Sequence, residues 1–399
     1  MPMNVERARS IMEQEGLDGL VASTLENFFY LSGIWNLGQE LFPHDTQAYV
    51  VARRDKPDAG TLVVSVGEAD LTLEAYPTIP GAVTYGTFWR ELPEGVQLDA
   101  NERRVWEITY QKQPAADAFE ALARAIEETG LTSGVLGVDE RGPDPDLLVQ
   151  LRTRFPRLEV RPAAQTFRKI RMVKTPAEHE RLIGALRTTE HALRTTVEAA
   201  REGVTERELA HVFEQAIVER GARPGFTLLR FGRGMALGQV SPGDTPLRKG
   251  DYLWFDVGCT HQGYRSDIGR IVSFGEPSPQ LVRLYNASKE GQTRAFELMT
   301  PGQRACDIFH AAVDRVREMG IPHYRRHHVG HGIGVEYYDL PILNPKTEIP
   351  LEPGMVFEVE TPYYEFGFGG AFIEDTVLIT NSGARVLTEL PRQLQVVGA

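Results

Sequence analysis

Four carboxylates lie in two stretches of the chain that have the composition of β-hairpins. Asp256 and Asp267 fall in FDVGCTHQGYRSDIG, and Glu360 and Glu374 fall in MVFEVETPYYEFGFGGAFIEDTVLI. Aspartate and, less strongly, glutamate are depleted in strands. Two acidic residues in each hairpin therefore require a specific explanation.

The expected strand pairing brings these carboxylates together. A four-residue loop, THQG, would place Asp256 opposite Asp267, and a three-residue loop at 366–368 would place Glu360 opposite Glu374. Like charges in opposed positions destabilise a strand pair. For one isolated pair, an aspartate that faces solvent is the simpler interpretation. Two such pairs in a partly buried site favour two divalent cations, which would neutralise all four charges.

A histidine-rich segment between the hairpins, RRHHVGHGIGVEYYDLP, offers a nitrogen ligand. His327 and His331 have the i, i+4 spacing of a helical metal-binding pair, but Gly330 and Gly332 argue against a helix. His331 is therefore expected on a glycine-rich strand or turn, where backbone can approach a ligand closely. A cluster of surface histidines is the alternative. Oxygen-rich ligation favours Mn²⁺, with Co²⁺, Zn²⁺ or Fe²⁺ as alternatives.

The elements that must position these residues divide the chain into two predicted domains. Strand-like runs at GLDGLVAST, AYVVAR, TLVVSVG and GVLGVDER, with helical spacing at 4–15 and 114–129, indicate an α/β domain over 1–165. The remainder, 166–399, is expected to contain the carboxylate hairpins. Its predicted helices are 176–201, a second to about residue 220 with Thr205 as N-cap, 279–298 and 305–318.

The composition limits the classes of partner. The chain has 399 residues, 42% hydrophobic residues and a net charge of -12. This charge argues against nucleic acid or an anionic membrane surface as the main partner, and no apolar run has membrane-spanning length. Two cysteines without metal-site spacing and a charged start without a signal-peptide pattern indicate a reducing, cytoplasmic location.

Five residues, considered together, resemble a known ligand set. Asp256, Asp267, His331, Glu360 and Glu374 match in order and spacing the metal ligands of the pita-bread metallopeptidases, which include methionine aminopeptidase, aminopeptidase P and prolidase, with creatinase as a metal-free relative. The stretches GYRSDIGR, HHVGHGIG, LEPGMVFEVE and IEDTVLIT agree locally. GLDGLVASTLENFFYLSG resembles the creatinase/prolidase N-terminal domain. The resemblance implies an α/β (α+β) fold: a creatinase/prolidase-like N-terminal domain, then a pita-bread catalytic domain with a curved antiparallel sheet and flanking helices.

The resemblance also implies a role for each ligand. Asp256 would bind one metal ion, His331 and Glu360 would bind the other, and Asp267 and Glu374 would bridge the two. A water or hydroxide shared by the ions would be the nucleophile. Glu360 would accept its proton and later donate it to the departing amine.

The substrate side departs from the family pattern at three positions. Histidines are usual where this chain has Gln239 and Tyr338, and an arginine is usual at Phe372. Tyr338 and Gln239 would supply other hydrogen-bond donors, Tyr338 towards a developing oxyanion. The resemblance places His327 near the substrate.

Two further groups are candidates for substrate contact. Glu358 shares the strand parity of Glu360 and is expected either to bind a substrate ammonium or to be an exposed carboxylate. A dipeptidase also needs a cation for the substrate carboxylate, for which Arg230, Arg233 and Arg326 are candidates; the alternative is that each is an ordinary surface arginine.

The resemblance implies hydrolysis of Xaa-Pro bonds in small proline-containing peptides. The expected activity is that of an Xaa-Pro dipeptidase (prolidase). The alternatives are an Xaa-Pro aminopeptidase acting on longer peptides and a non-catalytic metal- or peptide-binding homologue. A homodimer is expected by analogy with the family.

Overall fold

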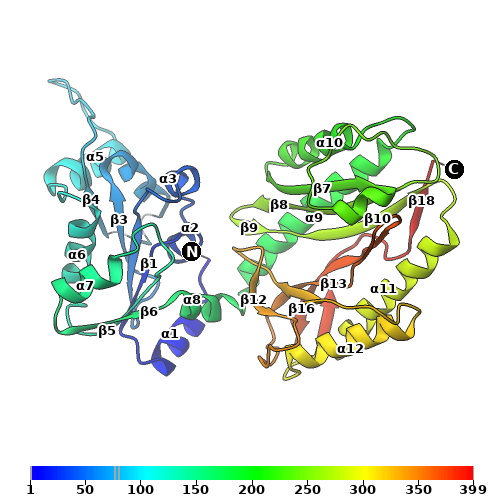
Figure 1. Ribbon diagram of the computed structural model, residues 1–399. Helices are drawn as coiled ribbons and strands as arrows, with labels where there is room; N and C mark the ends of the chain where they lie inside the picture. The colour runs from blue at the N-terminus through cyan, green and yellow to red at the C-terminus, as the bar shows by residue number, and fades with distance from the viewer. Residues whose placement is uncertain (1, 76–77, 80, 399) are drawn as a thin grey trace. The chain divides into compact units, whose positions relative to one another are not determined.

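The computed structural model describes residues 2–75, 78–79 and 81–398, which fall into two compact units, Met1–Arg171 and Met172–Ala399 (Figure 1). The sequence placed the boundary after residue 165. Helix α8 (Ala164–Arg171) packs against α1 (Val5–Gln14) and therefore belongs to the first unit. Each unit has its own hydrophobic core.

The first unit is built on a six-stranded mixed sheet in the order β4-β3-β2-β1-β5-β6. The central pairs β1–β2 and β2–β3 are antiparallel, whereas β3–β4, β1–β5 and β5–β6 are parallel. Its strands are β1 Gly19–Ala22, β2 Tyr49–Arg53, β3 Thr61–Ser65, β4 Gly81–Tyr85, β5 Gly134–Val138 and β6 Leu158–Pro162. The strands and helices predicted in this region are confirmed.

Helix α6 (Ala118–Glu128) shows why these segments fold as they do. Asp117 caps its N-terminus by accepting a hydrogen bond from the backbone of Glu120. Its buried residues recur at helical spacing and cover the sheet. The other α-helices of the unit are α2 Leu25–Ser32, α3 Leu37–Leu41, α4 Thr72–Ala75, α5 Ala100–Trp106 and α7 Leu147–Arg154. A 3-10 helix, η1 (Val66–Leu71), and a π-helix, η2 (Glu107–Gln111), are also present.

The second unit begins with two capped helices, α9 (Pro176–Glu198) and α10 (Glu206–Glu219). In each, a threonine N-cap and a glutamate three residues later form a reciprocal capping box. The prediction that Thr205 is an N-cap is therefore confirmed. Two more helices follow at the predicted positions, α11 (Pro279–Leu298) and α12 (Ala305–Glu318).

Two five-stranded, mainly antiparallel sheets form the centre of the second unit. The first contains β7 Arg223–Phe231, β8 Tyr252–His261, β9 Tyr264–Arg265, β10 Ile268–Phe274 and β18 Gln395–Val397. The second contains β11 Gly330–Gly332, β12 Asp339–Ile342, β13 Val356–Glu360, β16 Glu374–Thr380 and β17 Gly383–Val386. A small β14–β15 ribbon (Tyr363–Glu365, Gly369–Ala371) and the turn η3 (Gly232–Leu237) complete the strand layer.

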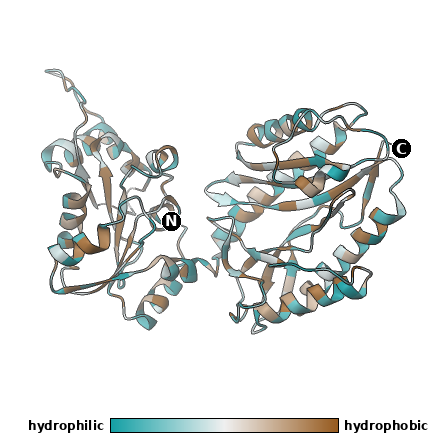
Figure 2. Ribbon diagram, in the orientation of Figure 1, coloured by the Kyte–Doolittle hydropathy of each residue, from teal (hydrophilic) through white to brown (hydrophobic). Residues whose placement is uncertain are grey.

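The helices cover the outer faces of these sheets. Helices α9 and α10 pack on β8 and β7, and α11 lies against β13 and β17 with α12 beside it (Figure 1). Strand β10, which Asp267 immediately precedes, contacts β16, which begins at Glu374, so the two sheets meet beside these acidic residues. Figure 2 shows hydrophobic colour along the central strands and hydrophilic colour on outward helix faces. Within the described chain, no helix is both long and apolar enough to cross a membrane.

Candidate metal centre

The second hairpin has the register expected from its sequence. Glu365 pairs with Gly369 in the β14–β15 ribbon, and Glu360 pairs with Glu374 between β13 and β16. Both paired glutamates are buried, with 7% and 2% of their surfaces exposed. The predicted approach of these two carboxylates is confirmed.

The register predicted for the first hairpin is wrong. Thr260 pairs with Arg265 and His261 pairs with Tyr264, which leaves a two-residue turn at Gln262 and Gly263 with φ angles of 50° and 80°. Two-residue turns with positive φ match the twist of the flanking strands. The shorter turn shifts the register, so that Asp256 lies opposite Gly269 and Asp267 immediately precedes β10.

The two aspartates nevertheless share one face of the sheet. They are diagonal neighbours rather than directly opposed residues, and a diagonal pair remains within reach of longer side chains. Their side chains share a hydrogen bond that partly offsets the raised pKa of Asp256. The shift of register therefore leaves the convergence of the carboxylates intact.

Residues from three different segments meet at the seam between the sheets. One ligand atom each from Asp267, His331 and Glu374 falls within 4.8 Å of the others. His331 Nε2 lies 4.0 Å from Asp267 Oδ2. Both Nε2 of His331 and Oδ1 of Asp267 are buried without a hydrogen-bond partner among the described residues, as expected for atoms that ligate a metal ion.

His331 is fixed in the tautomer that metal binding requires. It lies on the short strand β11, as predicted, and its Nδ1 is 3.1 Å from the carbonyl oxygen of Gly332. Donation from Nδ1 to this carbonyl leaves Nε2 with a free lone pair. Burial lowers the pKa of His331 to about 4, so the ring is neutral at pH 7.

Burial and mutual repulsion make the ionised form of these carboxylates unfavourable. Burial, and then the charge of Glu360, raise the pKa of Asp256 to about 8. Burial also raises the pKa of Asp267, Glu360 and Glu374, and neighbouring carboxylates add to the effect at Asp267 and Glu374. Groups that resist ionisation in this way are stabilised as anions by bound cations. The donor set, four carboxylates and one neutral imidazole, fits hard or borderline divalent metal ions.

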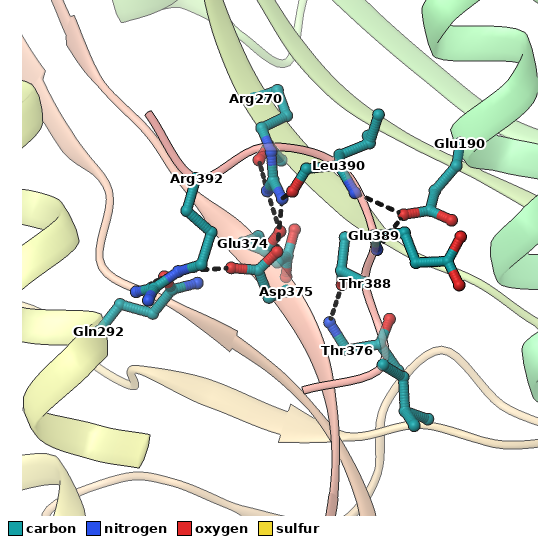
Figure 3. Close-up of polar contacts among 12 residues, drawn as sticks. Glu190, Arg270, Gln292, Glu374, Asp375, Thr376, Thr388, Glu389, Leu390 and Arg392 are labelled. Atoms are coloured by element: carbon teal, nitrogen blue, oxygen red, sulfur yellow. Dashed lines mark hydrogen bonds and ion pairs between the residues drawn. The ribbon is translucent and has the colours of Figure 1, made fainter. Parts of the chain in front are cut away.

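A buried ion-pair network holds Glu374 in place (Figure 3). Arg270 donates to the backbone carbonyl of Glu374 at 2.6 Å and pairs with Asp375 at 2.5 Å. Arg392 pairs with the other oxygen of Asp375 at 3.3 Å, and also bonds Gln292. Arg270 lies on β10, so this network ties together the two strands that carry or adjoin Asp267 and Glu374.

Two other candidates lie beside the cluster. The ring of Tyr338 stacks on His331, with centroids 3.8 Å apart and an interplanar angle of 16°. Glu358 is fully buried, so the expectation of an exposed strand carboxylate is wrong. It accepts a hydrogen bond from Thr376, and its Cα lies opposite that of His331.

Four other candidates differ in their exposure to solvent. Gln239, Arg233 and His327 are exposed. Phe372 is 1% exposed and lies in the core, where its ring is 6.0 Å from Trp254 and fills the space above Gly269. A buried core position offers Phe372 no surface for substrate.

His328, which sequence reasoning did not select, is buried at the site. Its Nδ1 lies 3.2 Å from Glu360 Oε1 and accepts from the backbone of Gly330. Burial and the neighbouring histidines lower the pKa of His328 to about 3. The one signal in the sequence was the adjacent His327–His328 pair, because either of two neighbouring histidines can be the one that faces the site.

The three candidate arginines have different surroundings. Arg230 pairs with the buried Glu206 and donates to the Ser241 carbonyl. Arg233 is exposed. Arg326 lies at the site, with Nη2 3.5 Å from Glu360 Oε2.

Comparison of the chain with known protein families identifies the class to which this fold and this group of residues belong. Metallopeptidase family M24 is matched by residues 180–381, and the creatinase/prolidase N-terminal domain by residues 4–173. The chain therefore belongs to metallopeptidase family M24.

Particular relatives share both sequence and fold. An uncharacterized peptidase of Staphylococcus aureus is 34% identical over 225 residues, which are 56% of this chain and 64% of that protein, somewhat less than two thirds of its length. The dipeptidase PepE of Mycobacterium ulcerans is 28% identical, with a TM-score of 0.77 over 98% of this chain and 96% of that one. Prolidase from Pyrococcus furiosus is 25% identical, with a TM-score of 0.73 over 96% and 99%.

Proposed function

We propose that this protein is a dinuclear metallopeptidase that hydrolyses Xaa-Pro bonds, preferably in dipeptides. The observation that carries the proposal is the buried group of Asp267, His331 and Glu374, with unpartnered ligand atoms and carboxylates that resist ionisation without a cation. Asp256 and Glu360 extend this group to the full five-ligand set. The family membership and the dipeptidase and prolidase among its structural relatives support the reaction and substrate class.

Each residue has a role in this proposal. Asp256 would hold one metal, His331 and Glu360 the other, and Asp267 and Glu374 both. When bound, two divalent ions lower the pKa of a water molecule and polarise the scissile carbonyl.

The surrounding residues would handle protons and developing charge. Glu360 would take up a proton and return it to the departing amine, and Nδ1 of His328 lies 3.2 Å from its Oε1. Tyr338, whose ring stacks on His331, would donate a hydrogen bond from its hydroxyl to a developing oxyanion. We propose Mn²⁺ as the metal, with Co²⁺, Zn²⁺ or Fe²⁺ as alternatives, and a cytoplasmic homodimer as the working form.

One experiment separates the candidate functions. The purified protein is loaded with Mn²⁺ or Co²⁺, and cleavage of an Xaa-Pro dipeptide is compared with cleavage of an Xaa-Pro-Xaa tripeptide. Cleavage confined to the dipeptide supports the proposal, whereas tripeptide cleavage indicates an aminopeptidase. If a protein loaded with two metal ions cleaves neither peptide, a non-catalytic binding role replaces the proposal.

A further inference from the structure

Arg326 is a largely buried cation beside Glu360 and is not one of the proposed metal ligands. The side chain of Arg326 is 13% exposed, and its guanidinium carbon lies 5.9 Å from the centre of the Tyr364 ring. Within the described chain its single hydrogen bond is the one to Glu360, whose 3.5 Å length is at the outer limit for such a bond. Its Nε is buried without a partner. Apart from this bond to Glu360, the guanidinium donors have no hydrogen-bond partner among the described residues.

A second unsatisfied donor accompanies this arginine. Tyr324 is 1% exposed, and its hydroxyl has no hydrogen-bond partner among the described residues. Tyr324 lies two residues before Arg326, in the same segment that leads to strand β11. Buried polar groups without partners are rare in folded proteins. A guanidinium and a hydroxyl are together complementary to an anion with two oxygen atoms, such as a carboxylate.

The covalent geometry of a dipeptide decides where its carboxylate must bind. Three bonds separate the scissile carbonyl carbon from the C-terminal carboxylate carbon, which keeps the two within about 4 Å. A cation that binds this carboxylate must therefore border the metal ligands. Arg326 contacts Glu360, whereas Arg230 is engaged by Glu206 and Arg233 is exposed.

We propose that Arg326, assisted by Tyr324, binds the free C-terminal carboxylate of an Xaa-Pro dipeptide and selects dipeptides over longer chains. In a longer peptide the same position is a neutral amide, which cannot form the ion pair. The inference rests on the proposed function. The inference also explains why the arginine that is usual in the family can be absent at Phe372. In this protein a different segment of the chain would supply the cation that binds the substrate carboxylate.

The test compares Ala-Pro with its C-terminal amide, Ala-Pro-NH₂, as substrates of the Mn²⁺-loaded protein. R326M should lower kcat/KM for Ala-Pro by roughly 10- to 100-fold, the range for a lost charged hydrogen bond, and change kcat/KM for the amide by less than about 3-fold. R326K retains the charge and should recover part of the loss. The matched control R325M removes the exposed neighbouring arginine and should change neither value.

The metal content of R326M distinguishes a role of Arg326 in substrate specificity from a purely structural role. If Arg326 only offsets the charge of Glu360, R326M will change the metal content or reduce cleavage of both substrates equally, and the inference is overturned. If the loaded wild type cleaves neither substrate, the proposed function fails. Calorimetry with the same two compounds as ligands then decides the inference: it stands only if Ala-Pro binds at least about 10-fold more tightly than the amide and R326M removes the difference.

Discussion

Asp267 is the residue at which metal binding and protein stability oppose each other. Its buried carboxylate has an unpartnered oxygen and lies among other carboxylates. We predict that D267N binds fewer than two metal ions and is inactive, yet is more stable than the wild type without metal. The gain should be about 1–3 kcal/mol, because the neutral amide avoids the free-energy cost of either ionising or protonating this buried carboxyl group at neutral pH. Metal content and chemical unfolding in chelator measure the two effects.

A matched control is D244N. Asp244 pairs with Arg207 at the surface, so this variant should retain both metal ions and near-wild-type stability. Retention of two metal ions by D267N would contradict the bridging role of Asp267.

Glu178 makes a pH-dependent contribution to stability away from the metal ligands. It accepts hydrogen bonds from the Thr175 backbone and from Tyr264, but burial raises the pKa of Glu178 to about 7. The folded state therefore binds this proton more tightly than the unfolded state. Stability conferred by protonation is present below about pH 4.5 and is lost as pH rises to about 7.

The neutral analogue E178Q should remove this dependence. The difference in unfolding free energy between E178Q and wild type should change by about 3 kcal/mol from pH 4.5 to 8, at about 1.4 kcal/mol per pKa unit. E208Q is the control, because Glu208 occupies the same capping-box position on α10, where hydrogen bonds at the exposed site lower the pKa of Glu208. Parallel pH curves for E178Q and wild type would contradict the assignment.

Residue types predicted which acidic side chains converge better than they predicted the residues around them. Carboxylates need a reason to occupy strands, so Glu360 and Glu374 were recognisable from their spacing alone. The burial of His328 and the exposure of His327 depend on which way the segment turns before β11. That direction is set by tertiary packing, which the local sequence does not specify.

At the scale of elements, the capped helices were predictable and the first turn was not. Thr205 and Glu208 carry a local capping signal. The turn at Gln262 requires a positive φ of 50°, and glutamine is not a residue that this conformation usually selects. Because the strand period is two residues, the resulting shift kept both aspartates on one face, and the chemical prediction survived an incorrect register.

Strand β11 gives a prediction at the element scale. Gly330 has a φ of 143°, and a Cβ there would lie 2.2 Å from the Glu358 carbonyl oxygen. G330A should therefore displace β11 and the His331 imidazole, lowering both metal affinity and stability, the latter by more than about 1–3 kcal/mol. Metal titration and thermal unfolding provide the measurements.

The control for G330A separates backbone strain from the clash. Gly302 also has a positive φ, 86°, but nothing lies within 4 Å of a Cβ at that position. G302A should therefore cost only the conformational strain and retain normal metal affinity. If G330A and G302A behave alike, close packing does not position His331.

At the scale of the whole molecule, separate cores predict separate responses to metal. The proposed ligands all lie in Met172–Ala399, whereas the core of Met1–Arg171 contains none of them. Mn²⁺ at about 100 times its Kd should stabilise the second unit by about 2.7 kcal/mol per site and leave the first unchanged. Two unfolding transitions are expected in chelator, because each unit has its own core.

Tryptophan fluorescence can assign the transitions. Trp254 is the one tryptophan of the second unit, buried on the strand that carries Asp256; Trp35, Trp89 and Trp106 belong to the first. In the triple variant W35F/W89F/W106F, fluorescence reports the second unit alone, and its midpoint should rise with Mn²⁺. In W254F, fluorescence reports the first unit, and its midpoint should stay fixed. Equal shifts in both variants would show that the two units unfold as one, since metal bound by one unit can stabilise the other only through cooperative unfolding.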